Sequence, residues 1–250
     1  MGVVYIGDRG TGKTHLAMEL ANPLSELVKV SSPEYEFLKS FLYDDSFEGT
    51  KATDANKEVD ARQLDIQVRL PTGIKQISVD WIDTPGEIWR KRWQADNPDK
   101  WKNFLDTAHQ SEGILLILPP YRNILKPGVD SRQFITQQQW CNRFKGWVEF
   151  FSNNCYKARR LVICLNKADL FCDIEKESSI LAHKNWHQRH IYVLQRYLNP
   201  IQTQIEQMNR SMDSSSVSCF ITSIYKRKLL ELPWIYMGTF LSQQVRFKAK

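Results

Sequence analysis

The stretch of sequence that decides the fold is Gly7-Asp8-Arg9-Gly10-Thr11-Gly12-Lys13-Thr14. It fits GxxxxGK[ST] at every fixed position, and it stands between a β-branched run at residues 3–6 and a helix predicted over residues 15–22. Glycines let such a loop curl so that its backbone N–H groups face phosphate oxygens, and the start of the following helix adds a positive dipole end. Lys13 is predicted to reach the β- and γ-phosphates, and the Thr14 hydroxyl to coordinate Mg²⁺. The loop therefore predicts a nucleoside-triphosphate site whose backbone contacts come from Gly7, Gly10, Thr11 and Gly12.

A second motif, Asp83-Thr84-Pro85-Gly86, follows a strand predicted over residues 75–82. A carboxylate at the carboxyl end of a strand beside the phosphate-loop strand is placed to hold Mg²⁺ through water, so Asp83 is predicted as a metal residue. Gly86 is predicted to offer its N–H to the γ-phosphate, because no Cβ blocks the approach. Taken alone the motif also suits a surface turn, and its position after the predicted strand favours the phosphate role.

A third motif, Asn166-Lys167-Ala168-Asp169, follows the apolar run at residues 161–165 and predicts which base is bound. A carboxylate only accepts hydrogen bonds, so Asp169 can take two from the N1–H and 2-amino groups of guanine, a donor pair that adenine lacks. Losing both charge-assisted bonds would cost about 3–6 kcal/mol. Lys167 can lay its stem over the base, and Asn166 can tie this loop back to the phosphate loop. An ordinary polar strand-to-loop transition is the alternative.

Six apolar or β-branched runs predict strands, at residues 3–6, 64–70, 75–82, 113–118, 161–165 and 217–221. The second and third flank a Pro-Thr-Gly turn and are expected to form an antiparallel hairpin. The last three are nearly continuous apolar runs, as strands buried on both faces are. Helices are predicted over residues 15–22, part of 87–109, 132–151, 185–208 and 233–247, the last with Pro233 in its first turn, and loops over 31–61 and 119–130. The alternation predicts an α/β fold with a mostly parallel sheet.

Composition and the absence of long apolar runs favour a globular protein over a membrane or secreted one. The chain has 250 residues, 42% of them hydrophobic and 25% charged, which suits one globular domain over residues 1–250. No apolar run approaches the ~20 residues that span a bilayer, and the first residues carry no secretory signal, so we expect a cytoplasmic protein. The odd number of cysteines, without CxxC pairs, suits a reducing compartment. A basic cluster, Lys226-Arg227-Lys228, is interpreted as a solvated face rather than as a contact for membrane or nucleic acid, and we expect no DNA partner.

With Thr222-Ser223 after the sixth predicted strand, the four motifs stand in one order, GDRGTGKT, DTPG, NKAD and TS, and the sequence resembles the Ras-like GTPases of the P-loop superfamily. The resemblance implies a three-layer fold, with a six-stranded sheet between helices and with GTP or GDP and Mg²⁺ at the carboxyl ends of the strands. It also implies that the N–H of Ile224 contacts guanine O6, beside Thr222 and Ser223. Two switch segments would sense the γ-phosphate and contact a protein effector or regulator. Tyr225 departs from the family, which more often carries Lys there.

Three further departures concern the reaction. Glu87 stands where the family usually has the Gln that orients the attacking water, and a helix-start Glu is the alternative interpretation. Arg9 replaces a common Gly and either acts at the phosphates as an internal arginine finger or points to solvent. The threonine of the first switch that binds Mg²⁺ is Thr53 or, as the alternative, Thr50.

The motifs together predict a GTPase that hydrolyses GTP to GDP with Mg²⁺ and acts as a molecular switch, with Lys13, Glu87 and Arg9 as catalytic candidates. The alternative is a GTP-binding scaffold or sensor with little or no hydrolysis. The long loops of this chain resemble those of divergent GTPase domains in prokaryotic multi-component proteins. Two other patterns receive plainer interpretations. Trp89 and Trp93 are expected to pack on the sheet rather than bind a partner, and His183, His187 and His190 to lie on a solvated helix face rather than bind a metal.

Overall fold

The computed structural model describes residues 2–8, 10–24, 27–42, 60–83, 91–155, 158, 160–211 and 216–248. Its centre is a seven-stranded sheet with the order β2-β3-β4-β1-β5-β6-β7. The strands are β1 (Val3–Gly7), β2 (Val28–Ser32), β3 (Asp60–Leu70), β4 (Gly73–Asp83), β5 (Gly113–Leu118), β6 (Arg160–Leu165) and β7 (Ser216–Ile221). β3 runs antiparallel to both of its neighbours, and all other pairings are parallel. The predicted α/β fold, with its hairpin and mostly parallel sheet, is confirmed.

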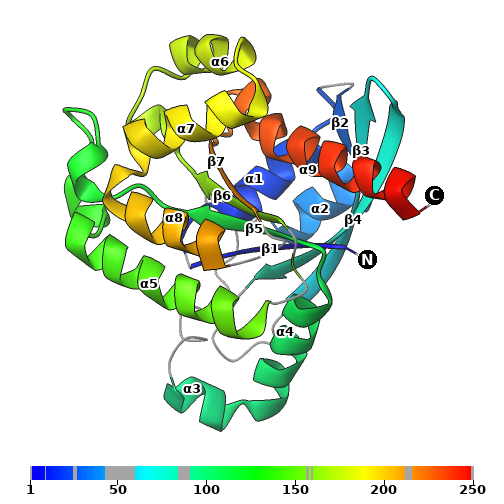
Figure 1. Ribbon diagram of the computed structural model, residues 1–250, viewed down its shortest axis with the longest axis horizontal. Helices are drawn as coiled ribbons and strands as arrows, with labels where there is room; N and C mark the ends of the chain where they lie inside the picture. The colour runs from blue at the N-terminus through cyan, green and yellow to red at the C-terminus, as the bar shows by residue number, and fades with distance from the viewer. Residues whose placement is uncertain are drawn as a thin grey trace.

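Nine α-helices lie within the described ranges: α1 (Lys13–Ala21), α2 (Tyr35–Leu42), α3 (Lys91–Asp96), α4 (Pro98–Gln110), α5 (Gln137–Asn154), α6 (Ile174–Ala182), α7 (Trp186–Tyr197), α8 (Gln202–Ser211) and α9 (Arg227–Lys248). α1, α2 and α9 cover one face of the sheet, and α4, α5 and α8 cover the other (Figure 1). This gives the three layers that the family resemblance implies. No helix in the described part of the chain is long and apolar enough to cross a membrane.

Alternation along β1 shows how the core divides between the two faces. Val3 and Tyr5 point into the layer beneath α1 and α9, whereas Val4 and Ile6 point into the layer beneath α4 and α5. All four are buried. Because each face is covered by helices, the central strands carry apolar residues at every position rather than at alternate ones. Burial of each such side chain contributes about 1.5–3 kcal/mol.

The structure differs from the prediction in several elements. The sheet has a seventh strand, β2, at its edge, and α2 follows it within the stretch predicted as loop. The single helix predicted over residues 185–208 is two helices, because Asn199-Pro200 forms a 3-10 turn between α7 and α8. α9 begins at Arg227, so Pro233 lies inside the helix rather than in its first turn. The helix tolerates it at the cost of one backbone hydrogen bond.

The interpretation of the basic cluster as a solvated face is wrong for Arg227, whose side chain is 17% exposed. Its guanidinium donates to the backbone carbonyls at the end of α1 and the start of β2, namely those of Glu19, Leu20, Asn22 and Val28. It also pairs with the buried carboxylate of Glu231 at 2.7 Å. Lys226 forms an ion pair with Glu175, and only Lys228 of the three is exposed. This cluster therefore joins α9 to α1 and α6.

Candidate functional site

The phosphate loop leaves β1 at Gly7 and enters α1 at Lys13. A Cβ on Gly7 would lie 2.4 Å from the backbone oxygen of Ile117 in β5, so only glycine permits this approach of the two strands. Gly10 and Gly12 have φ angles of 76° and 87°, a region that glycine enters at little cost. The Thr11 hydroxyl donates to the Asp8 carbonyl at 2.9 Å and closes the turn. The loop thus has the curled backbone on which phosphate binding depends.

The Lys13 ammonium lies inside this curl. Lys13 is 4% exposed, and its Nζ donates to the carbonyls of Gly7 at 2.7 Å and Asp8 at 2.9 Å. The helix that follows begins here, so the Lys13 charge and the positive end of the α1 dipole occupy one region. Thr14 is the second residue of α1 and is partly exposed. An anion is the ligand that this arrangement suits.

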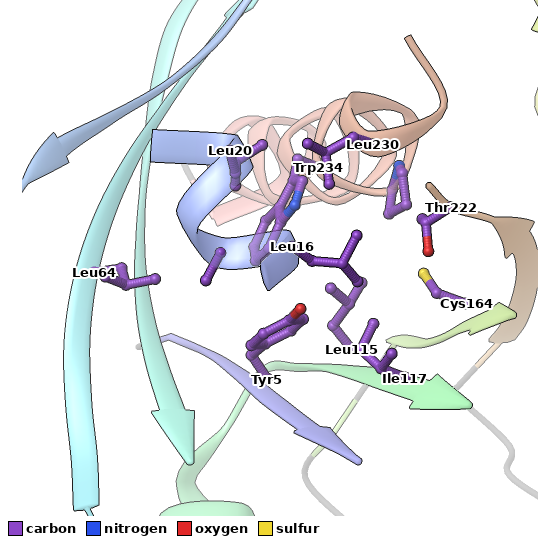
Figure 2. Close-up of a pocket in the computed structure, with 12 residues that line it drawn as sticks. Tyr5, Leu16, Leu20, Leu64, Leu115, Ile117, Cys164, Thr222, Leu230 and Trp234 are labelled. Carbon is purple, nitrogen blue, oxygen red and sulfur yellow. The ribbon is translucent and has the colours of Figure 1, made fainter. Parts of the chain in front are cut away.

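Apolar packing fixes the start of α1 above the sheet. The Tyr5 hydroxyl donates to the Lys13 carbonyl at 3.0 Å. Figure 2 shows Tyr5 beneath α1, with Leu16 and Leu20 on the helix and Trp234 of α9 beside them. The cavity between these side chains measures about 10 Å³. That is at most the size of one water molecule, so the space is a packing defect rather than a ligand site.

Asn166 joins the phosphate loop to the loops after β6 and β7. It is 3% exposed, its amide Nδ2 donates to the Thr11 carbonyl at 2.8 Å, and its Oδ1 accepts from the Thr222 hydroxyl at 3.1 Å. The backbone N–H of Asn166 donates to Leu118 at the end of β5 at 2.9 Å. The tie between Asn166 and the phosphate loop that the sequence predicts is therefore present, and it includes Thr222 as well.

Lys167 and Asp169 face the same region from the turn after β6. Lys167 has a left-handed φ of 60°, and its Cε lies 3.7 Å from where a Gly12 Cβ would stand. Burial lowers the pKa of the Lys167 ammonium, and the carboxylate of Asp169 opposes part of that shift. The Ser223 hydroxyl donates to Asp169 Oδ1 at 2.5 Å, which fixes the carboxylate. The Lys167 stem thus runs alongside the phosphate loop.

The loop after β7 completes this side. The Ala168 N–H donates to the Thr222 carbonyl at 3.0 Å, and Ser223 accepts the N–H of Tyr225 at 3.2 Å on its Oγ. Ile224 lies between these residues and is partly buried. Thr222, Ser223 and Ile224 therefore stand beside Asp169, although the sheet strands that carry the two loops are far apart in the chain.

Asp83 is the last residue of β4, at the carboxyl end where the sequence places it. Trp81 pairs with Tyr5 of β1, so Asp83 and Gly7 each lie two residues further on at the same edge of the sheet. Six other residues singled out from the sequence lie outside the described residues, namely Arg9, Thr50, Thr53, Gly86, Glu87 and Trp89. Trp93, by contrast, is buried in the core cluster on one face of the sheet, as expected. His190 is not on a solvated face: its Nδ1 accepts the N–H of Cys219 at 3.2 Å.

Two residues at this site belong to no sequence motif and were not predicted. Lys126 donates from Nζ to the Asp169 carbonyl at 2.9 Å, and the Phe134 ring lies 5.8 Å from Lys167 Nζ. Both belong to the loop between β5 and α5. The sequence predicts a loop over residues 119–130 and a helix from residue 132, but α5 begins at Gln137 after its cap at Thr136, so Phe134 lies in the loop. A lysine forty residues before the base-reading motif carries no local signal of this contact.

The fold is a P-loop fold of the Ras-like GTPase type. Its phosphate loop lies between β1 and α1, an acidic residue ends the adjacent strand, and polar loops follow β6 and β7.

Comparison with solved structures finds chains similar to this one. A GTP-binding protein from the hyperthermophilic archaeon Sulfolobus solfataricus, in complex with GDP, superposes with a TM-score of 0.50 at 11% identity over 97% of this chain. This chain covers 53% of that protein. The signal recognition particle receptor SRb-GTP/SRX complex from Chaetomium thermophilum gives a TM-score of 0.49 at 14% identity, over 95% of this chain and 97% of that one. No protein-family model and no curated protein sequence matches the chain.

Proposed function

We propose that this protein binds GTP and GDP and hydrolyses GTP, changing its affinity for a protein partner with the nucleotide state. The observation that carries the proposal is the position of Asn166, which bonds to Thr11 of the phosphate loop and to Thr222 of the last loop. Two loops that would hold the phosphates and the base are thereby built as one site. A solved GTP-binding protein of similar fold, described in complex with GDP, supports this choice of ligand.

Guanine is the base that the polar groups suit. Asp169 presents a carboxylate already oriented by Ser223, and a pair of adjacent N–H donors on guanine can satisfy both of its oxygens. The stem of Lys167, held beside Gly12, would cover one face of the base. Adenine offers no matching donor pair, so its binding would leave the carboxylate desolvated without a partner.

Phosphate binding would use the curl that Lys13 now fills with its own hydrogen bonds. A nucleotide phosphate would replace the carbonyls of Gly7 and Asp8 as partners of the ammonium. Thr14 and Asp83 are the residues that would hold Mg²⁺, which neutralises phosphate charge when bound. One hydroxyl and one carboxylate, with water and phosphate oxygens, are a typical donor set for this ion. In hydrolysis the role of Lys13 is to stabilise charge on the phosphate oxygens as the bond to the leaving diphosphate breaks.

The test is single-turnover hydrolysis of [γ-³²P]GTP with Mg²⁺ by the full chain, beside the variants Lys13→Ala and Lys102→Ala. Lys102 is an exposed lysine of α4 and serves as the matched control. We expect phosphate release by the wild type and by Lys102→Ala, and a large loss in Lys13→Ala, with thermal melting to confirm that each variant folds. Tight GTP binding without phosphate release over hours would overturn hydrolysis and indicate a scaffold or sensor instead.

Base recognition has its own test. The change Asp169→Asn replaces an acceptor with a donor, which suits the carbonyl that xanthine carries in place of the 2-amino group. We expect this variant to lose affinity for GTP and to gain affinity for xanthosine triphosphate. A variant that kept the wild-type preference for GTP would remove Asp169 from the base site.

A further inference from the structure

The loop between β5 and α5, residues 119–136, is closed at its neck by Arg122. The Arg122 backbone N–H donates to the carbonyl of Ile135 at 2.9 Å, and its guanidinium donates to the carbonyls of Ser131 at 3.2 Å and Phe134 at 3.0 Å. Trp140 of α5 donates from Nε1 to the carbonyl of Pro119 at 2.9 Å. We call this segment the β5–α5 loop. Its two sides are bonded to each other, so it holds a defined shape.

The tip of the β5–α5 loop lies on the turn that carries Asp169. Lys126 donates from its backbone N–H to the carbonyl of Leu170 and from Nζ to the carbonyl of Asp169, both at 2.9 Å. Asp169 is therefore held from two directions, because Ser223 bonds to its carboxylate and Lys126 bonds to its main chain. Hydrogen bonds that involve a charged donor are the stronger class.

The neck of the same loop lies near the other base-reading residue. The ring of Phe134 has its centroid 5.8 Å from the Lys167 ammonium, within the range of a cation–π contact. Phe134 is held in place because its carbonyl accepts from Arg122. Lys167 sits in the left-handed region, with φ of 60°, where a non-glycine backbone needs support from its surroundings.

We propose that Lys126 of the β5–α5 loop sets the guanine preference of the nucleotide site by holding Asp169 in the geometry that reads the ring edge, and that Phe134 of the same loop positions Lys167 and so affects the affinity for both nucleotides alike. This rests on the proposed function. Asp169 lies in a 3-10 turn of only three residues, Ala168–Leu170. A carboxylate discriminates between bases only if it meets both donors of the ring edge at once, so the turn that carries it must be fixed. Lys126 itself is exposed and contacts the turn rather than the ligand.

The experiment measures the Kd of GTP and of inosine triphosphate, with Mg²⁺, for the full chain and for Lys126→Met, Lys126→Arg and Lys102→Met. Inosine lacks the 2-amino group, so it forgoes one of the two bonds to Asp169, and the wild type is expected to prefer GTP. Lys126→Met keeps the apolar stem and removes the bond to the Asp169 carbonyl. We expect it to lower the preference for GTP, measured as the Kd of inosine triphosphate divided by the Kd of GTP, about three- to tenfold. Lys126→Arg should restore most of the ratio, and Lys102→Met should leave it unchanged.

Phe134→Leu gives a contrasting result. The Lys167 stem covers the face of the base, which guanine and hypoxanthine share, so this change should weaken both nucleotides by a similar factor and leave the ratio intact. A Lys126→Met variant that weakens both equally, or that only lowers the melting temperature, overturns the proposal. A wild type that binds neither nucleotide overturns the proposed function as well, whereas an unaltered GTP preference in Lys126→Met overturns this inference alone.

Discussion

Asn166 and Thr11 are 155 residues apart in the chain, and the amide of the first donates to the carbonyl of the second at 2.8 Å. The same side chain accepts from Thr222 on its other atom. One buried amide thus satisfies a carbonyl of the phosphate loop and a hydroxyl of the loop after β7. A side chain with both a donor and an acceptor is required at this position, which neither aspartate nor leucine provides.

Replacement of Asn166 by alanine is expected to weaken both folding and nucleotide binding. The change leaves the Thr11 carbonyl and the Thr222 hydroxyl buried without this partner, which costs about 1–3 kcal/mol of unfolding free energy. Urea unfolding measures that loss, and GTP affinity is expected to fall as the two loops separate. Asn154→Ala is the matched control, because the Asn154 amide donates to the Phe150 carbonyl within α5 and away from the phosphate loop. Equal GTP affinities for the two variants would contradict a coupling role for Asn166.

Substitution of Gly12 and of Gly146 by alanine compares a glycine with a positive φ and a crowded Cβ position with one that has neither constraint. Gly12 has φ of 87°, and a Cβ there would stand 2.7 Å from Asn166 Nδ2, so Gly12→Ala meets both strain and a clash. We expect at least a tenfold loss of GTP affinity, which corresponds to about 1.4 kcal/mol. Gly146 lies exposed within α5 with nothing near its Cβ position. Gly146→Ala should raise the unfolding free energy by about 0.5–1 kcal/mol and leave GTP binding unchanged. Isothermal titration and urea unfolding of both variants check this contrast.

Much of the fold could be predicted from the sequence because the central strands are buried on both faces and therefore consist of continuous apolar runs. β5 reads as a continuous apolar run since helices cover both of its faces. β2 could not be predicted this way. β2 (Val28–Ser32) is short, and its apolar residues alternate with polar ones. The strand is fixed by its pairing with β3, in which Val28 lies opposite Val68. Such a contact has no signature in the local pattern.

In the candidate site, too, residues within local motifs could be predicted and residues fixed by distant contacts could not. The residues of the phosphate and base-reading motifs could be named because their spacing along the chain is set by the loop geometry that each motif builds. Lys126 and Arg227 could not be, because their partners are carbonyl groups far away in the sequence. A run of three basic residues around Arg227 has the composition of a solvated surface, and only the packing of α9 against α1 reveals its hydrogen bonds.

Arg227 is predicted to be a stability residue. Arg227→Met removes the bonds to the carbonyls at the end of α1 and leaves the carboxylate of Glu231 buried without its cation. Breaking a buried pair by removal of one partner costs about 3–5 kcal/mol. The neighbouring Lys228 is exposed, so Lys228→Met should change the unfolding free energy by less than about 0.5 kcal/mol. Comparable urea midpoints for the two variants would show that the guanidinium contributes no more than a surface charge.

His190 is predicted to make folding sensitive to pH. Its Nδ1 accepts the N–H of Cys219 on the edge strand β7, which requires an unprotonated nitrogen. Burial, and then the charge of His187, lowers the pKa of His190 below its ordinary value of 6.5. The unfolded chain therefore takes up the proton first as the pH falls. The stabilisation is present above pH 6.5 and is lost as the pH falls through the folded-state pKa.

Urea unfolding between pH 7.5 and pH 5 measures this loss, and two variants assign it. His190→Gln removes the titrating group, so its unfolding free energy should fall less steeply over this interval than that of the wild type. His183→Gln is the control, because His183 is an exposed residue at the end of α6. It should reproduce the wild-type slope. His15, whose pKa is also lowered by burial and by Lys167, is unchanged in both variants and contributes equally to their slopes. A wild-type slope retained in His190→Gln would assign the pH dependence to His15 or to another group rather than to the edge of the sheet.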